Sequence, residues 1–165
     1  MTSTPVTLCF LIRDRPGGGT EVLLGLKKTG FGRGKIVGLG GHVEPGESHA
    51  EAACREVGEE AGVTVLERDL RPAGVVEFVF PARPEWNMCT TLFTTRRWQG
   101  EPVESREIAP EWFDALSLPV DRMWQDADHW LPVVLEGRTV DIVVTLNADN
   151  ETVASSVSIL RNLSP

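Results

Sequence analysis

Alternating apolar and polar positions predict strands at several places along the chain. Residues 6–14 and 21–27 read as two strands, and the segment 16–19 between them contains one proline and three glycines. Gly and Pro mark tight turns, so the two segments are predicted to form a β-hairpin. A glycine-rich stretch, 30–41, follows, and its last glycines are expected in a loop.

The helical pattern is clearest at 48–61. Ser48 can cap the first turn and Glu51 can complete a capping box, while Gly62 stands where a left-handed residue ends a helix. A stripe of small apolar residues follows the helical period and is expected to pack on a sheet: Ala50, Cys54, Val57 and Ala61.

The remaining elements alternate between strand and helix patterns. Strands are predicted at 73–80, 88–98, 139–146 and 152–160, with a loop at 83–87 and a second helix at 125–135. One long helix between two groups of strands, followed by a later helix, predicts a mixed α/β (α+β) fold arranged as an α/β/α sandwich.

Composition narrows the class of protein. The chain has 165 residues and a formal net charge of −8, so we expect one domain over residues 1–165 and no nucleic-acid polymer as partner. We find no apolar run near the ~20 residues of a membrane helix and no signal-peptide pattern. The three cysteines show no C-x-x-C spacing. We therefore expect a cytoplasmic, monomeric protein without a membrane partner.

One segment carries a dense set of carboxylates. Residues 41–63 read GHVEPGESHAEAACREVGEEAGV. On a helix, residues three and four apart share a face, so Glu56 neighbours Glu59 and Glu60 and the three carboxylates repel one another. Mg²⁺ would convert that repulsion into binding, since it takes carboxylate oxygens. Arg55 would lie beside Glu51 and Glu59. The alternative is a solvated acidic helix without a ligand.

The spacing of this segment decides between these readings. It fits G-x5-E-x7-R-E-U-x-E-E-x-G-U at every fixed position, with U aliphatic. This is the signature of the Nudix family, and the chain is identified as a member on it. The resemblance implies the Nudix fold, a mixed sheet with a catalytic loop–helix–loop, and a Nudix box at 41–63.

Further segments resemble one branch of that family, the oxidised purine nucleoside triphosphate hydrolases, or 8-oxo-dGTP diphosphatases. They are 24–42, 100–113 and 121–134. The resemblance implies hydrolysis of a small-molecule (deoxy)nucleoside triphosphate to monophosphate and pyrophosphate, which removes oxidised purines from the nucleotide pool. It also implies Mg²⁺ as cofactor, with Mn²⁺ as a substitute.

Site residues follow from the same resemblance. The metal ligands would be the carbonyl of Gly40 with Glu56, Glu59, Glu60 and Glu107, and Arg55 would complete the catalytic group. The substrate pocket would contain Thr7, Lys27, Phe31, Phe78, Trp124 and Asp126, with Phe80, Met88 and Ile108 around them. Core packing is the competing role for Phe80 and Trp130.

Two pocket positions depart from the family. Val37 replaces an asparagine that reads the base, and Ala127 replaces a second aspartate after Asp126. A net hydrogen bond contributes about 0.5–1.5 kcal/mol, enough to reorder preferences among purines. Two alternatives therefore stay open: a Nudix hydrolase of another nucleoside diphosphate derivative, such as a dinucleoside polyphosphate or ADP-ribose, and a binding module without turnover.

Overall fold

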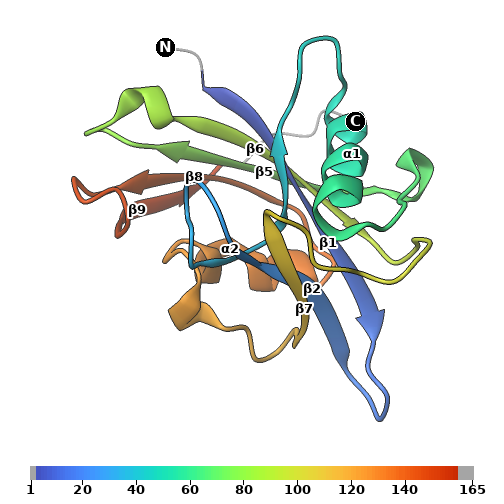
Figure 1. Cartoon of the computed structure of the whole chain (residues 1–165). Coiled ribbons are helices and arrows are strands. Elements are labelled where there is room, and N and C mark those ends of the chain that lie inside the picture. The colour runs from blue at the N-terminus through green and yellow to red at the C-terminus, as the bar shows by residue number, and fades with distance from the viewer. Residues whose placement is uncertain (1–2, 160–165) are drawn as a thin grey trace, which may run out of the picture.

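The computed structural model describes residues 3–159, in which nine strands form one mixed sheet and two α-helices pack against it (Figure 1). The strands are β1 (Thr4–Asp14), β2 (Thr20–Lys27), β3 (Ile36–Val37), β4 (Leu39–His42), β5 (Arg71–Val79), β6 (Met88–Thr95), β7 (Ile108–Asp114), β8 (Val140–Leu146) and β9 (Val153–Ser158). The helices are α1 (His49–Ala61) and α2 (Ala127–Leu135), and short 3-10 turns lie at Glu67–Asp69, Pro84–Trp86 and Val120–Arg122.

Strand β1 is the centre of the sheet. It pairs in parallel with β6 on one edge, and on its other edge it pairs antiparallel with β4 and then with β2. The main order is β3-β2-β1-β6-β5-β8-β9, and β7 pairs with β2. Both β1 with β6 and β5 with β8 run in parallel. The predicted mixed sheet is thereby confirmed.

Each face of the sheet carries its own hydrophobic core. Successive residues of a strand point to opposite faces, so β1 contributes Phe10 to one core and Cys9 and Leu11 to the other. The first core includes Trp130 of α2, and the second includes Val57 of α1. The helices therefore cover opposite faces, as the predicted sandwich requires.

Several predicted elements are found where local sequence placed them. The first hairpin forms between β1 and β2, with Ile12 opposite Val22. Helix α1 begins after Ser48, whose side chain accepts a hydrogen bond from the Glu51 amide, and Gly62 ends it with a φ of 70°. The capping box and the left-handed C-cap are both present, as predicted.

Three strands were missed, and the expected loop before α1 is partly wrong. The stretch 30–41 contains β3 and most of β4, and Gly40 and Gly41 lie in β4 rather than in a loop. Glycine has low strand propensity, but pairing with β1 overrides it. Strand β7 was missed because its pairing with β2 joins residues far apart in sequence.

Element ends differ by a few residues from the predictions. Strand β6 ends at Thr95 instead of 98, because Gln99 turns to bridge Thr64. Helix α2 begins at Ala127, two residues later than predicted. Strand β9 covers most of the predicted 152–160, of which residue 160 lies outside the described residues.

The expected single domain over 1–165 remains a prediction, and its ends at 1–2 and 160–165 are not among the described residues. Within residues 3–159, no helix is long and apolar enough to cross a membrane.

Candidate active site

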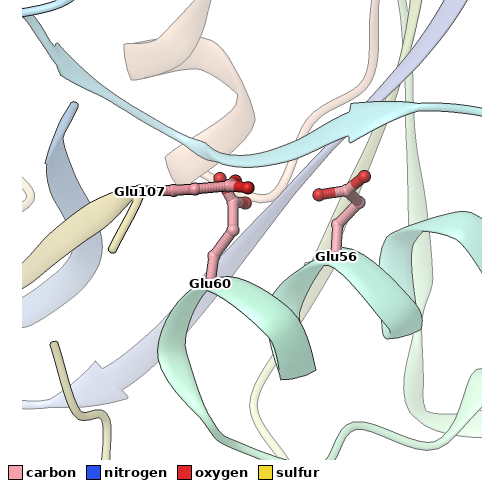
Figure 2. A group of neighbouring side chains, drawn as sticks. All are labelled: Glu56, Glu60 and Glu107. Carbon is pink, nitrogen blue, oxygen red and sulfur yellow. The ribbon is translucent and has the colours of Figure 1, made fainter. Parts of the chain in front are cut away.

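Helix α1 presents carboxylates on the side that faces β4 and β7. Glu56 and Glu60 project from successive turns of α1, and Glu107 reaches them from the residue just before β7 (Figure 2). Each contributes an oxygen, and these oxygens lie within 4.8 Å of one another. Among the described residues this is the one group of three that could hold a metal ion. We refer to these three residues as the acidic cluster.

The expected ligand Glu59 lies outside the acidic cluster. Its side chain is 58% exposed and accepts a hydrogen bond from Arg55 Nη1 at 3.2 Å. The carbonyl role expected of Gly40 also stays a prediction. The contact that the structure gives is through its amide, which donates to Glu60 Oε1 at 2.7 Å.

Burial and mutual repulsion disfavour charge on the acidic cluster. Glu60 is only 4% exposed, and this burial raises its pKa to about 8; the charges of Glu56 and Glu107 act in the same direction, while the Gly40 amide opposes them. Burial also raises the pKa of Glu56, against the lowering effect of Arg55. A hard divalent cation fits this donor set, because it neutralises adjacent carboxylates and prefers oxygen ligands.

Arg55 holds several carboxylates in fixed positions. Its Nε and Nη2 donate to the two oxygens of Glu47 at 2.7 and 3.0 Å, and its Nη1 donates to Glu56 at 3.0 Å. These hydrogen bonds raise the pKa of Arg55, and they hold the pKa of Glu47 down at about 2. Arg55 lies one helical turn from both Glu51 and Glu59, as predicted; it donates to Glu59, whereas the Glu51 carboxylate accepts a hydrogen bond from the Ser48 amide in the capping box.

Two glycines let β4 approach the acidic cluster. A Cβ atom at Gly41 would lie 2.5 Å from Glu56 Oε1, and one at Gly40 would overlap the carbonyl oxygen of Thr7 on β1. A side chain at either position would therefore push β4 away from α1 or from β1. The glycines of the motif act here through close backbone approach.

An apolar cavity of about 220 Å³ adjoins the acidic cluster, and Glu60 lines it. Its wall is formed mainly by apolar side chains: Val6, Leu8, Phe10, Phe31, Ile36, Val37, Phe78, Phe80, Met88, Met123, Trp124, Ala127, Trp130, Leu131 and Leu146. The polar side chains on the wall are those of Lys27, His42, Glu60, Thr90, Asp126 and Asn150.

Most of the predicted pocket residues line this cavity, but Thr7 does not. Lys27, Phe31, Phe78, Trp124 and Asp126 are on its wall, together with Phe80 and Met88. Thr7 lies between Val6 and Leu8, which both face the cavity, so its side chain points to the α1 face of the sheet. There its hydroxyl is buried and has no hydrogen-bond partner within residues 3–159. Ile108 also lies on that side, within the core beneath α1.

Asp126 and Trp124 mark the end of the cavity at α2. The buried carboxylate of Asp126 accepts a hydrogen bond from the Trp130 indole at 2.9 Å, and burial raises its pKa. The Trp124 ring stacks on Phe31 at 5.3 Å between centroids. Trp130 thus has a polar role beside its core packing, which the sequence did not indicate.

The departures Val37 and Ala127 both line the cavity, so their apolar side chains replace polar groups on its wall. Three polar residues on the wall were not predicted, namely His42, Thr90 and Asn150. Asn150 comes from the turn between β8 and β9, where the sequence predicted only the two flanking strands.

The mixed sheet, the capped glutamate-rich helix and the adjoining cavity define a mixed α/β protein that carries carboxylates on a loop–helix–loop motif beside a cavity. A family model for the NUDIX domain matches residues 2–134. The chain therefore belongs to the Nudix family, as predicted from its motif.

Similar proteins agree with this assignment. The chain is 42% identical to the oxidized purine nucleoside triphosphate hydrolase of Danio rerio, over 82% of this chain and 81% of that protein. Its identity to the protein of that name from Mus musculus is 39%, with the same coverage. Among solved structures it resembles the MutT protein of Bacillus halodurans, with a TM-score of 0.78 and 25% identity over 98% and 99% of the two chains.

Proposed function

We propose that this enzyme hydrolyses oxidised purine nucleoside and deoxynucleoside triphosphates to monophosphate and pyrophosphate, and so removes them from the nucleotide pool. The observation that carries the proposal is that an apolar, aromatic-rich cavity opens directly onto the acidic cluster through Glu60. Such a cavity suits a base, and the cluster suits the phosphate chain with its cations. The names of the Danio rerio and Mus musculus relatives agree with this substrate class.

Mg²⁺ is the cofactor we propose, with Mn²⁺ as a substitute. Glu56, Glu60 and Glu107 would hold it, and the Gly40 carbonyl and Glu59 would complete the ligand set expected from the family. When bound, the cation neutralises phosphate oxygens and the negative charge that develops on them during hydrolysis.

The protein's own groups then have separate tasks. One carboxylate of α1, from Glu56, Glu59 or Glu60, accepts a proton from the attacking water. Arg55 keeps Glu56 and Glu47 in position. Trp124 and Phe31 offer ring faces for stacking on a purine, which contributes about 1–3 kcal/mol per base.

The cavity also bears on which purine is preferred. Lys27 adds a positive charge to the cavity wall that also includes Glu60, and Asp126 offers one carboxyl group to the base edge. Burial raises the pKa of this carboxyl group, and the Trp130 indole donates to its Oδ2. With Val37 and Ala127 beside it, we expect 8-oxo-dGTP to be discriminated from dGTP less strongly than in relatives that keep both polar groups.

A substrate panel tests the proposed function. We expect kcat/KM with Mg²⁺ to be at least about tenfold higher for an oxidised purine triphosphate than for the unmodified one, which corresponds to about 1.4 kcal/mol. The panel contains 8-oxo-dGTP, dGTP, 8-oxo-dATP, 2-oxo-dATP, ADP-ribose and a diadenosine polyphosphate, and product analysis should find pyrophosphate. A higher value for ADP-ribose or the dinucleotide would reject the proposal in favour of another Nudix activity.

Arg55→Lys should lower Mg²⁺ affinity and kcat/KM by about 10–100-fold, as is usual for residues that orient metal ligands. Lysine keeps the charge but cannot donate to both oxygens of Glu47 and to Glu56 at once. Calorimetric titration with Mg²⁺ and steady-state kinetics measure both effects. Arg68→Lys, at an exposed position on the turn Glu67–Asp69, is the matched control. Equal effects of the two substitutions would contradict a positioning role for Arg55.

We propose a cytoplasmic monomer that acts on free nucleotides and not on nucleic-acid polymers. The net charge of −8 supports the last point, because a polymer-binding surface requires clustered basic residues.

A further inference from the structure

Asn150 is an unexpected polar residue on the wall of the cavity. It lies in the turn between β8 and β9, and its backbone is left-handed, with a φ of 60°. Among the described residues it is the one non-glycine residue with a positive φ. Asparagine tolerates this conformation better than most residues, so the turn can hold a functional side chain here without glycine.

Hydrogen bonds fix the turn internally. The backbone N–H of Asn150 donates to the backbone carbonyl of Asn147 at 2.9 Å. Asp149 Oδ1 accepts hydrogen bonds from the amides of Glu151 and Thr152, and its Oδ2 accepts one from the Thr152 hydroxyl. These bonds lower the pKa of Asp149, which is therefore ionised at neutral pH. The position of Asn150 is thus set by a closed local network.

The turn is also tied to the segment that carries the other base-pocket residues. The amide of Val153 at the start of β9 donates to the side chain of Gln125, which lies between Trp124 and Asp126 in sequence. Further along, the His129 ring and the Ser156 hydroxyl are 3.1 Å apart. Asn150 is therefore held in a defined place relative to the α2 end of the cavity.

The side-chain oxygen of Asn150 is buried and has no hydrogen-bond donor among the described residues. A buried carbonyl oxygen without a hydrogen-bond donor is unfavourable, because it has lost its contact with water and gained no partner. Within a cavity proposed to bind a base, a ligand N–H group can remove this cost. The unpaired acceptor is thus an observation that points to a ligand, independently of the residues expected from the family.

We propose that Asn150 determines base specificity in this enzyme, in place of the polar groups absent at Val37 and Ala127. This inference rests on the proposed function. An 8-oxopurine carries hydrogen on N7, whereas an unmodified purine has a lone pair there. The Asn150 oxygen can accept a hydrogen bond from that N7–H, and it repels the lone pair of the unmodified base. The preferred substrates are accordingly triphosphates of 8-oxopurines.

The test compares substitutions at Asn150 by their effect on substrate ratios. Asn150→Gly keeps the left-handed backbone and removes the side-chain carboxamide. The ratio of kcat/KM for 8-oxo-dGTP to that for dGTP should therefore fall about 5–10-fold. Asn150→Asp keeps an acceptor and should retain most of the ratio. Glu151→Gln, in the exposed part of the same turn, is the matched control and should leave the ratio unchanged, because Glu151 enters the network only through its backbone amide.

Each other outcome would overturn the inference in a recognisable way. An unchanged ratio in Asn150→Gly would mean that the base is read elsewhere, while the proposed function would stand on the wild-type activity. An equal fall for both substrates, with a lower Tm, would mean that Asn150 only stabilises the turn. A wild-type enzyme inactive on all purine triphosphates would reject the proposed function itself.

Discussion

Replacing Glu56 with glutamine is expected to lower kcat/KM by about a thousandfold while the fold stays intact. Glutamine keeps the shape of the side chain but provides neither a negative ligand for Mg²⁺ nor a proton acceptor. General acid–base groups typically contribute about 10²–10⁴-fold, so a loss within this range is the physical expectation. Steady-state kinetics with 8-oxo-dGTP and saturating Mg²⁺ measure the effect.

The fold should tolerate this change because it also relieves repulsion within the acidic cluster, although it removes the ion pair with Arg55. Glu51→Gln is the matched control on the same helix. Its side chain serves the capping box, a role that glutamine also fills, and it lies outside the cluster. A Glu56→Gln variant within tenfold of wild type would show that catalysis does not depend on this carboxylate. A wild-type protein that binds nucleotides without turnover would favour the binding module instead.

The second large effect concerns pH and metal. Without a divalent cation, the free energy of unfolding should fall as pH rises from about 4.5 to about 8. The folded protein keeps a proton on Glu60, whose pKa is about 8, while the unfolded chain releases it near 4.5. Between these two pKa values the folded state binds more protons than the unfolded chain. The stability that depends on the Glu60 proton is therefore fully present below the unfolded pKa and is lost as pH rises through the folded pKa. The fall in the free energy of unfolding over this range is on the order of 3–5 kcal/mol, because each pH unit between the two pKa values contributes about 1.4 kcal/mol.

Mg²⁺ should reverse this trend, because it binds the ionised carboxylates and so stabilises the folded state more as pH rises. Urea unfolding at pH 5, 6.5 and 8 measures the free energy of unfolding without metal, in EDTA, and with Mg²⁺. Glu60→Gln cannot titrate, so it should flatten the metal-free profile and be more stable than wild type at pH 8. A profile parallel to that of wild type would assign the pH dependence to other groups.

A separate effect is expected in acid and provides an internal check. The pKa of Glu47 is lowered to about 2 by its hydrogen bonds with Arg55. Its contribution to stability is therefore present above about 4.5 and is lost as pH falls toward 2, a window that does not overlap that of Glu60.

Interactions within a few residues of one another were predictable from sequence. The ends of α1 depend on Ser48, Glu51 and Gly62, whose contacts reach no further than four residues. The placement of Glu56 and Glu60 on one face follows from the helical period alone. The spacing of the motif then identified the Nudix family without any knowledge of the fold.

Contacts between distant segments were less accessible. Glu107 lies far along the chain from Glu60, and only a resemblance to the family pointed to it. Thr7 was assigned to the pocket by resemblance alone, and it is not on the cavity wall, because its neighbours Val6 and Leu8 face the cavity and successive residues of a strand point to opposite faces.

The sequence by itself thus determined the helix, its carboxylates, the family and the class of chemistry, because these depend on local spacing. Only the tertiary structure decided that Glu107 completes the acidic cluster, that Trp130 donates to Asp126, and that Asn150 reaches the cavity. Each of these depends on strand pairing or helix packing between segments, and many different pairings are compatible with the same local pattern. The polar groups that read a base are therefore set by the assembled sheet and not by the motif.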